Sequence, residues 1–270
     1  MTTAEATRVS SDWLDLREPA DAAARSRDLV RQLRGRLPSR GPLVVHDLAC
    51  GTGSMGRWLA PLLPGPQHWI LHDRDPDLLE LAAVDVPAAA AVSVETRLGD
   101  VTRLGPDDLA GASLVTASAL LDLLTQDELA ALADTCAGAG RPALFTLSVT
   151  GRVQLLPADP LDARVATAFD EHQRRVTSRG RLLGPDAVDA AVEAFRMLGA
   201  ELVVKPSAWR LGSDQAGLAA EWLTGWIGAA CEQEPALVPD ADLYRRRRLR
   251  EAAAGLLGVT VGHADLMVLP

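Results

Sequence analysis

Short apolar runs alternate with stretches in which apolar residues recur at helical spacing along most of this chain. Each run is too short for a buried helix and ends in a polar or glycine-containing segment, which is typical of a strand. The predicted strands are residues 43–45, 69–71, 91–94, 113–118, 142–149, 201–204 and 259–268. The predicted helices between them are residues 55–63, 78–82, 126–139 and 187–198. Alternating strands and helices predict an α/β fold built on a parallel sheet.

Helical patterns outside this alternation predict additions to the sheet. Residues 12–37 are expected to form one or two helices, with Pro19 breaking between them, inside an N-terminal helical cap at residues 1–40. Residues 151–157 could extend the fifth strand or form a hairpin arm. Further helices are expected at residues 159–172, 216–231 and 243–257. We therefore expect one domain over residues 1–270 that carries two insertions, at residues 151–183 and 212–257.

Glycines and acids gather where the first strands end. Asp47 ends the first strand and leads into Gly51 and Gly53, Asp73 ends the second strand, and Asp100 follows the third. Ligands of open parallel sheets bind at the carboxyl ends of the strands, so these residues are expected to share one site. Glycine lets the backbone approach a ligand closely, and a carboxylate such as Asp73 can accept both hydroxyl hydrogens of a ribose. The pattern therefore predicts a nucleoside cofactor.

Two cofactors fit this description. The string from Gly51 to Gly56 reads GxGxxG, with Asp73 about 20 residues later, as NAD-binding sites require. Asp47, however, would repel a diphosphate, whereas its charge suits a cofactor that carries an ammonium and a sulfonium. Asp100 can accept an adenine amino hydrogen while Val101 covers the ring. A short dehydrogenase is also disfavoured because its Tyr-x-x-x-Lys pair is missing.

The motifs at these strand ends are similar to those of a known enzyme family. The segments VHDLACGTG at residues 45–53, DRDPDLLELA at residues 73–82 and GDV at residues 99–101 resemble the first three motifs of class I S-adenosylmethionine (SAM)-dependent methyltransferases. The resemblance covers about residues 40–150, and one departure is Ala49, where the family more often has glycine. It implies SAM as cofactor, with S-adenosylhomocysteine (SAH) as product.

The resemblance also implies a fold and a set of site residues. The fold is a Rossmann-like seven-stranded sheet of order 3-2-1-4-5-7-6, with the last strand antiparallel, helices on both faces, and the helical insertions as lids. The implied cofactor-binding residues are Asp47, Ala49, Gly51, Gly53, Asp73, Arg74, Asp100, Val101, Ser118 and Arg17. Arg17 would lie over the methionine end of SAM, or else be a solvated arginine beside Glu18. Asp122 is either a substrate contact or a residue beside the next helix start.

The acceptor side of the site is less defined. Methylation of a hydroxyl or a carbon acid usually needs a base, and histidine is the natural candidate. Of five histidines, His172 in the first insertion is predicted as the catalytic base, with a surface histidine as the alternative. His46, His68 and His72 are expected to be structural, and His263 is expected to lie far from the cofactor.

Arginines and tryptophans in the insertions suggest substrate contacts. Four arginines crowd one segment and could select an anionic acceptor, although a run of charges more often forms a solvated face. These are Arg174, Arg175, Arg179 and Arg181. Three tryptophans, Trp209, Trp222 and Trp226, could line the acceptor pocket or pack in the core.

Composition narrows the partners. The formal net charge of −9 disfavours nucleic acid and anionic membranes, which require a positive surface. No apolar run approaches a membrane span, and the N-terminus lacks the apolar centre of a signal peptide, so a cytoplasmic location is expected. Three scattered cysteines predict neither a disulfide framework nor a metal site. The abundance of arginine and alanine favours a small-molecule methyltransferase of an actinobacterial type.

Together these patterns predict a SAM-dependent methyltransferase that acts on a small-molecule acceptor and can form a homodimer through its insertions. The alternative is a non-catalytic or non-methylating protein that binds SAM or SAH.

Overall fold

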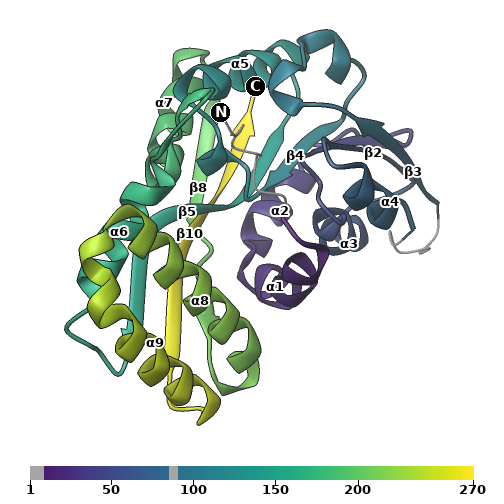
Figure 1. The fold of residues 1–270 in the computed structure, drawn as a ribbon. Helices are drawn as coiled ribbons and strands as arrows, with labels where there is room; N and C mark the ends of the chain where they lie inside the picture. The colour runs from purple at the N-terminus through teal and green to yellow at the C-terminus, as the bar shows by residue number, and fades with distance from the viewer. Residues whose placement is uncertain (1–8, 85–90) are drawn as a thin grey trace.

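A single mixed sheet forms the centre of the molecule (Figure 1) in the computed structural model, which describes residues 9–84 and 91–270. Its strand order is β3-β2-β1-β4-β5-β10-β8, and β9 pairs with β10 beside this path. The strands are β1 Leu43–Leu48, β2 Gln67–Asp73, β3 Val92–Leu98, β4 Leu114–Ser118, β5 Ala143–Leu156, β8 Glu201–Pro206, β9 Trp209–Leu211 and β10 Gly258–Leu269. Strands β1 to β5 pair in parallel, whereas β10 runs antiparallel to β5 and β8. The predicted order and antiparallel last strand are confirmed, and β9 is an addition.

Helices cover both faces of the parallel part of the sheet. One face packs against α2 (Arg27–Arg34), α3 (Ser54–Leu59) and α4 (Pro76–Val84). The other packs against α5 (Gln126–Ala139) and α7 (Ala187–Met197). Alternation along each strand divides the core, so that in β1 the side chain of Val45 joins the first cluster and that of Leu48 joins the second.

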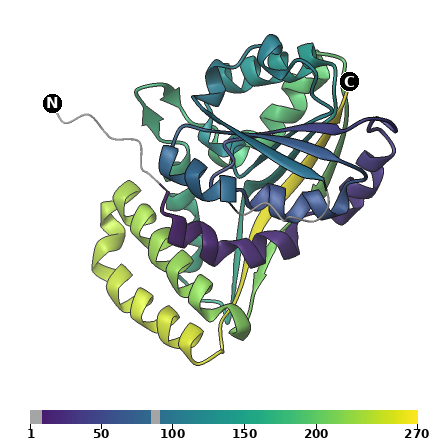
Figure 2. The same cartoon turned by 90° about the vertical axis from the view of Figure 1, so that its right-hand side faces the viewer.

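The two longest strands carry the fold beyond the ordinary sheet. Strands β5 and β10, of 14 and 12 residues, run on together past the parallel strands, and β9 pairs with this extension of β10. Figures 1 and 2 show this ribbon entering a second helical layer formed by α6 (Asp162–Gln173), α8 (Ala216–Gln233) and α9 (Val238–Ala253). Residues 151–156 therefore extend the fifth strand, one of the two predicted arrangements. We call the extension and these three helices the cap.

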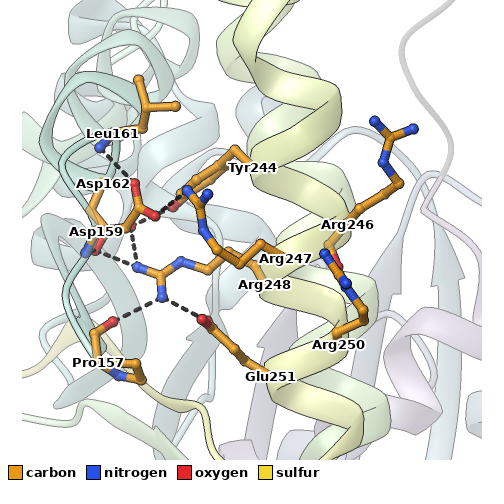
Figure 3. A network of polar contacts seen from close by, with 10 residues as sticks. All are labelled: Pro157, Asp159, Leu161, Asp162, Tyr244, Arg246, Arg247, Arg248, Arg250 and Glu251. Atoms are coloured by element: carbon orange, nitrogen blue, oxygen red, sulfur yellow. Dashed lines mark hydrogen bonds and ion pairs between the residues drawn. The ribbon is translucent and has the colours of Figure 1, made fainter.

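The cap has its own apolar core and one buried ionic network. Figure 3 shows the Arg248 guanidinium donating to both Asp162 oxygens, at 2.6 and 2.7 Å, and to the Pro157 carbonyl and Glu251 carboxylate, each at 2.8 Å. The Tyr244 hydroxyl donates to Asp162 at 2.5 Å. These bonds fix α9 against the turn between β5 and α6.

The N-terminal helix departs from the sequence-based expectation. Helix α1 (Ser11–Ala24) continues through Pro19, although proline there cannot donate a helical hydrogen bond, and the break comes instead at Arg25. Ser26 then caps α2 by accepting from the amide of Leu29. The predicted break at Pro19 is therefore wrong, because packing of α1 against β9 and α8 holds the helix together. Residues 1–8 of the predicted cap segment 1–40 lie outside the described residues.

Short elements complete the chain. The 3₁₀ segments are η1 Ala60–Leu62, η2 Val101–Arg103, η3 Pro106–Leu109, η4 Leu121–Leu123, η5 Gly184–Asp186, η6 Ser213–Gln215 and η7 Pro235–Leu237. A small hairpin joins β6 (Val176–Thr177) and β7 (Gly180–Arg181). Across residues 9–84 and 91–270, every helix is too short or too polar to pass through a bilayer.

Candidate functional site

One cavity of about 560 Å³ runs from the carboxyl ends of the parallel strands into the space beneath the cap. This volume lies in the usual range for ligand pockets. Its first part, the cofactor half, is lined by predicted site residues: Ala49, Gly51, Asp73, Arg74, Asp100, Val101 and Ser118. A smaller cavity of about 50 Å³ adjoins it, and Asp47 lies there together with Arg17, Ala49, Gly51 and Ser118. Of the predicted cofactor residues, only Gly53 lines neither cavity.

The turn after β1 is built from left-handed backbone. Ala49, Gly51 and Gly53 have φ values of 53°, 57° and 85°. Glycine adopts this region without penalty, whereas Ala49 occupies it at a cost that L-residues ordinarily avoid. A Cβ on Gly51 would lie 3.1 Å from Leu14 of α1, and one on Gly53 would lie 3.4 Å from Ala82. Gly53 therefore serves close packing and the start of α3, while Gly51 lets α1 close over the turn.

Asp73 is held in position by the backbone around it. One carboxylate oxygen accepts from the amide of Gly51 and the other from the amide of Asp75, both at 2.9 Å. The residue is only 7% exposed, yet it lines the cavity. Each carboxylate oxygen has a second lone pair, so both can also accept from a pair of adjacent hydroxyls. The geometry matches a ribose-binding carboxylate.

Asp47 is a buried acid with one unsatisfied oxygen. Thr116 donates to its Oδ1 at 2.8 Å, whereas Oδ2 has no partner and the residue is 1% exposed. Burial raises the pKa of Asp47 to about 7, although the Thr116 hydrogen bond and the charge of Arg25 oppose this. A buried acceptor without a partner is costly, and an ammonium placed in the small cavity would satisfy it.

Asp100 and Val101 lie at the next strand end, as expected. Asp100 accepts from the amide and the hydroxyl of Thr102, at 3.0 and 2.7 Å, which caps η2. Partial burial would raise the pKa of Asp100, but the hydrogen bonds from Thr102 lower it. An ionised acceptor beside an apolar side chain suits an adenine ring with its amino group.

Arg17 lies between the large cavity and the small one. It lines both cavities and donates to Asp21 at 2.9 Å, and its guanidinium lies 5.0 Å from the ring centre of Trp209. Trp209 in turn donates its indole N–H to Asp21 at 2.9 Å. Arg17 is therefore paired with Asp21 and partly buried, unlike the solvated arginine that was the alternative, and Glu18 pairs with Arg57.

The second part of the cavity, the acceptor half, has aromatic walls and two unpartnered polar atoms. Its aromatic lining consists of Trp13, Phe169, Trp209 and Trp222. Asp122 and His263 also line the cavity, and neither Asp122 Oδ1 nor His263 Nδ1 has a hydrogen-bond partner. Trp226, by contrast, stacks behind Trp222 with ring centres 5.1 Å apart.

His263 is the site residue that the sequence analysis missed. Its place on the last strand predicted a position far from the cofactor, but β10 passes along the wall of the cavity that also holds the cofactor half. Burial, and next the charge of Arg17, lower the pKa of His263 to about 3. The side chain is therefore neutral at pH 7. The apolar residues on both sides of Gly262 to Asp265 indicate one continuous buried strand, and this is the sequence signal that could have placed His263 in the interior.

His172 lies outside the cavity. Its Nε2 atom is 3.1 Å from the Glu232 carboxylate of α8, while Phe169 and Gln173 of the same helix line the cavity. The assignment of His172 as catalytic base stays a prediction, and this placement does not favour it.

The four arginines of the first insertion are mostly matched by carboxylates. Arg174 donates to Asp186 at 2.6 Å and to Glu171 at 3.1 Å, and Arg179 donates to Glu128 at 2.7 Å. Arg179 lines the cavity, whereas Arg174, Arg175 and Arg181 do not. The arrangement gives no concentrated positive site for an anionic acceptor, which stays a prediction.

Comparisons with known proteins agree with this geometry. Residues 45–143 match the family described as a methyltransferase domain. No curated protein matches the chain.

Solved structures match it over nearly its whole length. The cyclopropane synthase MmaA2 from Mycobacterium tuberculosis has 12% identity and a TM-score of 0.52, with 97% of this chain and 95% of that chain covered. The mycolic acid cyclopropane synthase CmaA1, complexed with SAH and CTAB, has 13% identity and a TM-score of 0.50, with coverages of 95% and 94%. The YcgJ protein from Bacillus subtilis has 12% identity and a TM-score of 0.50, with coverages of 90% and 97%. At these identities the likeness is one of fold.

Proposed function

From the match of residues 45–143 to a methyltransferase domain and from the shared fold, we propose that the chain is a class I SAM-dependent methyltransferase that methylates a small, largely apolar acceptor in the acceptor half of its cavity. The observation that carries the proposal is the continuity of the cavity. A single space of about 560 Å³ joins Asp73 and Asp100 to Trp209 and Trp222. A methyl donor and an acceptor can therefore meet within one cavity.

The residues of the cofactor half fit SAM as its ligand. Asp47 has an unsatisfied oxygen for the ammonium, Asp73 has free lone pairs for the ribose hydroxyls, and Asp100 can accept from the adenine amino group. When bound, SAM supplies a methyl group already activated by a sulfonium. What remains for the chain is to orient the acceptor, exclude water and accept any proton that leaves.

The N-terminal helical segment predicted at residues 1–40 and the two insertions are proposed to enclose the acceptor. Leu14 of α1 lies against Gly51, and Trp13 and Arg17 of the same helix line the cavity. Phe169 and Gln173 come from the insertion at residues 151–183, and Trp222 comes from the insertion at residues 212–257. This enclosure favours a small molecule over a macromolecular acceptor. The homodimer and the cytoplasmic location stay predictions.

The proposal is tested with SAM that carries a labelled methyl group. Purified protein is incubated with this SAM and a protein-free extract of small molecules, and the products are separated by size and polarity. We expect label in a small-molecule product that is absent when the protein is heated first. SAM binding without any transfer of label would instead favour the non-catalytic alternative.

A further inference from the structure

We propose that Asp122 is the catalytic base of this methyltransferase and that its acceptor is an uncharged, flat aromatic molecule bearing a hydroxyl group. The inference rests on the proposed function and specifies its acceptor. It replaces His172, which lies outside the cavity, with a carboxylate that lies inside it.

The shape of the acceptor follows from where the aromatic side chains lie. The whole chain has six tryptophans, three phenylalanines and one tyrosine. Trp13, Trp209, Trp222 and Phe169 all line the acceptor half. Trp13 meets Trp209 edge to face, with ring centres 6.4 Å apart. Such walls favour a flat apolar ligand that can stack or pack edge to face.

The position of Asp122 makes it the group that can take a proton. It lies in η4, just after β4, and lines the cavity that also contains the cofactor half. Its Oδ1 atom is buried without a hydrogen-bond partner, and a small rotation of the side chain would turn this unused acceptor toward a ligand hydroxyl in the cavity. Burial raises the pKa of Asp122 to about 6, with its own backbone amide and Arg17 opposing. The carboxylate is therefore mainly ionised at pH 7 and yet basic enough to accept a proton.

The charges around Asp122 favour a hydroxyl over an ammonium. Positive groups face it from two elements, Arg17 of α1 and Arg175 after α6, and Arg179 binds the adjacent Leu123 carbonyl at 3.2 Å. A cationic acceptor would be repelled by these guanidinium groups, whereas an oxygen that becomes negative as its proton leaves would be stabilised. The Arg17 charge is shared with Asp21, so it does not form a site for a permanent anion.

His263 is assigned as a positioning residue. It is buried in the wall of the same cavity, with its ring centre 5.2 Å from that of Trp209 and its Nδ1 atom unpartnered. Because its pKa lies far below 7, it is a weak base, but its neutral ring can hydrogen-bond to the acceptor.

The chemical balance of the step is simple. The acceptor O–H bond breaks as the new O–C bond forms, and the proton passes to Asp122. The electron pair of the broken C–S bond stays on sulfur, which becomes the neutral thioether of SAH. No oxidant, reductant or further reactant is required.

The test measures binding of a defined aromatic hydroxyl to SAH-saturated protein. Calorimetry compares 2-naphthol with 2-methoxynaphthalene, which has no O–H, from about pH 5 to about pH 8. Wild type is expected to bind 2-naphthol on the order of tenfold more tightly at the high end, because a hydrogen bond to a carboxylate is strong. This preference should shrink at and below about pH 6 as Asp122 is protonated.

Two variants make the test specific. Asp122→Asn should remove the preference and its pH dependence while the Kd for SAH stays unchanged. Asp170→Asn is the matched control, because burial also raises the pKa of Asp170 to about 6, but this residue does not line the cavity. It should behave as wild type.

Several results would overturn the inference. These are an unchanged preference in Asp122→Asn, an equal loss in Asp170→Asn, tighter binding of naphthylmethylamine than of 2-naphthol, or no binding of 2-naphthol to SAH-loaded protein. Failure of wild type to bind SAH in the first titration would instead overturn the proposed function, so the two failures are distinct.

Discussion

The cofactor half and the cap achieve fixed geometry by opposite means. In the cofactor half, the backbone does the positioning, since the amides of Gly51 and Asp75 hold Asp73 and left-handed residues shape the turn. In the cap, side chains do the positioning, since Arg248 joins residues 86 positions apart through its pair with Asp162. The first arrangement is local in sequence, and the second is not.

This difference predicts where each region is vulnerable. A backbone-built site depends on conformation at a few residues and loses little stability when one side chain changes. A cap fixed by one buried guanidinium depends on that group, because removing it leaves Asp162 and Glu251 without their partner. The substitutions below test the contrast, beginning with the largest expected effect.

The largest effect is expected from Arg248→Met. The Arg248 side chain is 1% exposed and that of Asp162 is 18% exposed, so the variant strands a partly buried carboxylate. The free energy of unfolding should fall by about 3 kcal/mol, the lower end of the cost of breaking a buried pair. Urea unfolding measures this change.

Arg246→Met on the same helix is the control, because Arg246 is 63% exposed and pairs only at the surface with Asp242. It should cost well under about 1 kcal/mol. Equal losses in the two variants would show that the network in Figure 3 does not hold the cap.

A smaller effect, of opposite sign, is expected from Asp47→Asn. Burial raises the pKa of Asp47 from 3.8 to about 7, so the folded state binds this proton more tightly than the unfolded state. Wild type should therefore lose stability as the pH rises from about 4 to about 7, at up to about 1.4 kcal/mol per pH unit. The asparagine variant lacks this loss and should therefore be more stable than wild type at pH 8, with the difference shrinking toward pH 4.

The same variant should bind SAH more weakly, because its amide cannot pair with the ammonium as a carboxylate does. Unfolding and calorimetry at pH 5 and pH 8 measure both changes. A variant less stable than wild type at pH 8 would contradict the view that Asp47 is retained for binding rather than for folding.

The smallest effect is expected from Ala49→Gly. Glycine removes the penalty for the φ of 53° but gains entropy in the unfolded chain, so the net stabilisation should be at most about 1 kcal/mol. Ala22→Gly, within α1, is the comparison, and it should destabilise the protein because glycine is unfavourable in a helix. Thermal unfolding of both variants measures the two changes. Destabilisation by Ala49→Gly would mean that the alanine methyl contributes more by packing than it costs by strain.

The same contrast explains what could be predicted from the sequence. Gly51 follows β1 and Asp73 ends β2, so both belong to motifs at the ends of neighbouring strands, and the structure places both at the cavity. The sequence leaves Asp122 between a substrate contact and a residue beside the next helix start, and it does not assign His263 to the site, because only the path of β10 and the turn after β4 bring both to one cavity. The predicted break at Pro19 is wrong because packing of α1 against the distant strand β9 overrides the local preference of proline. The prediction of His172 as base rests on its place in an insertion, and such a position does not fix the direction of a side chain.

The central claim is that an adenosyl sulfonium or thioether ligand binds across the ends of β1, β2 and β3, with Asp73 as its ribose contact. Calorimetric titration with SAH of wild type, Asp73→Ala and the exposed control Glu80→Ala tests it most directly. We expect binding by wild type and the control, and an affinity lower by about 10- to 100-fold in Asp73→Ala, as for a lost hydrogen bond to a charged group. Unchanged SAH affinity in Asp73→Ala, or binding of NAD in place of SAH by wild type, would contradict the account.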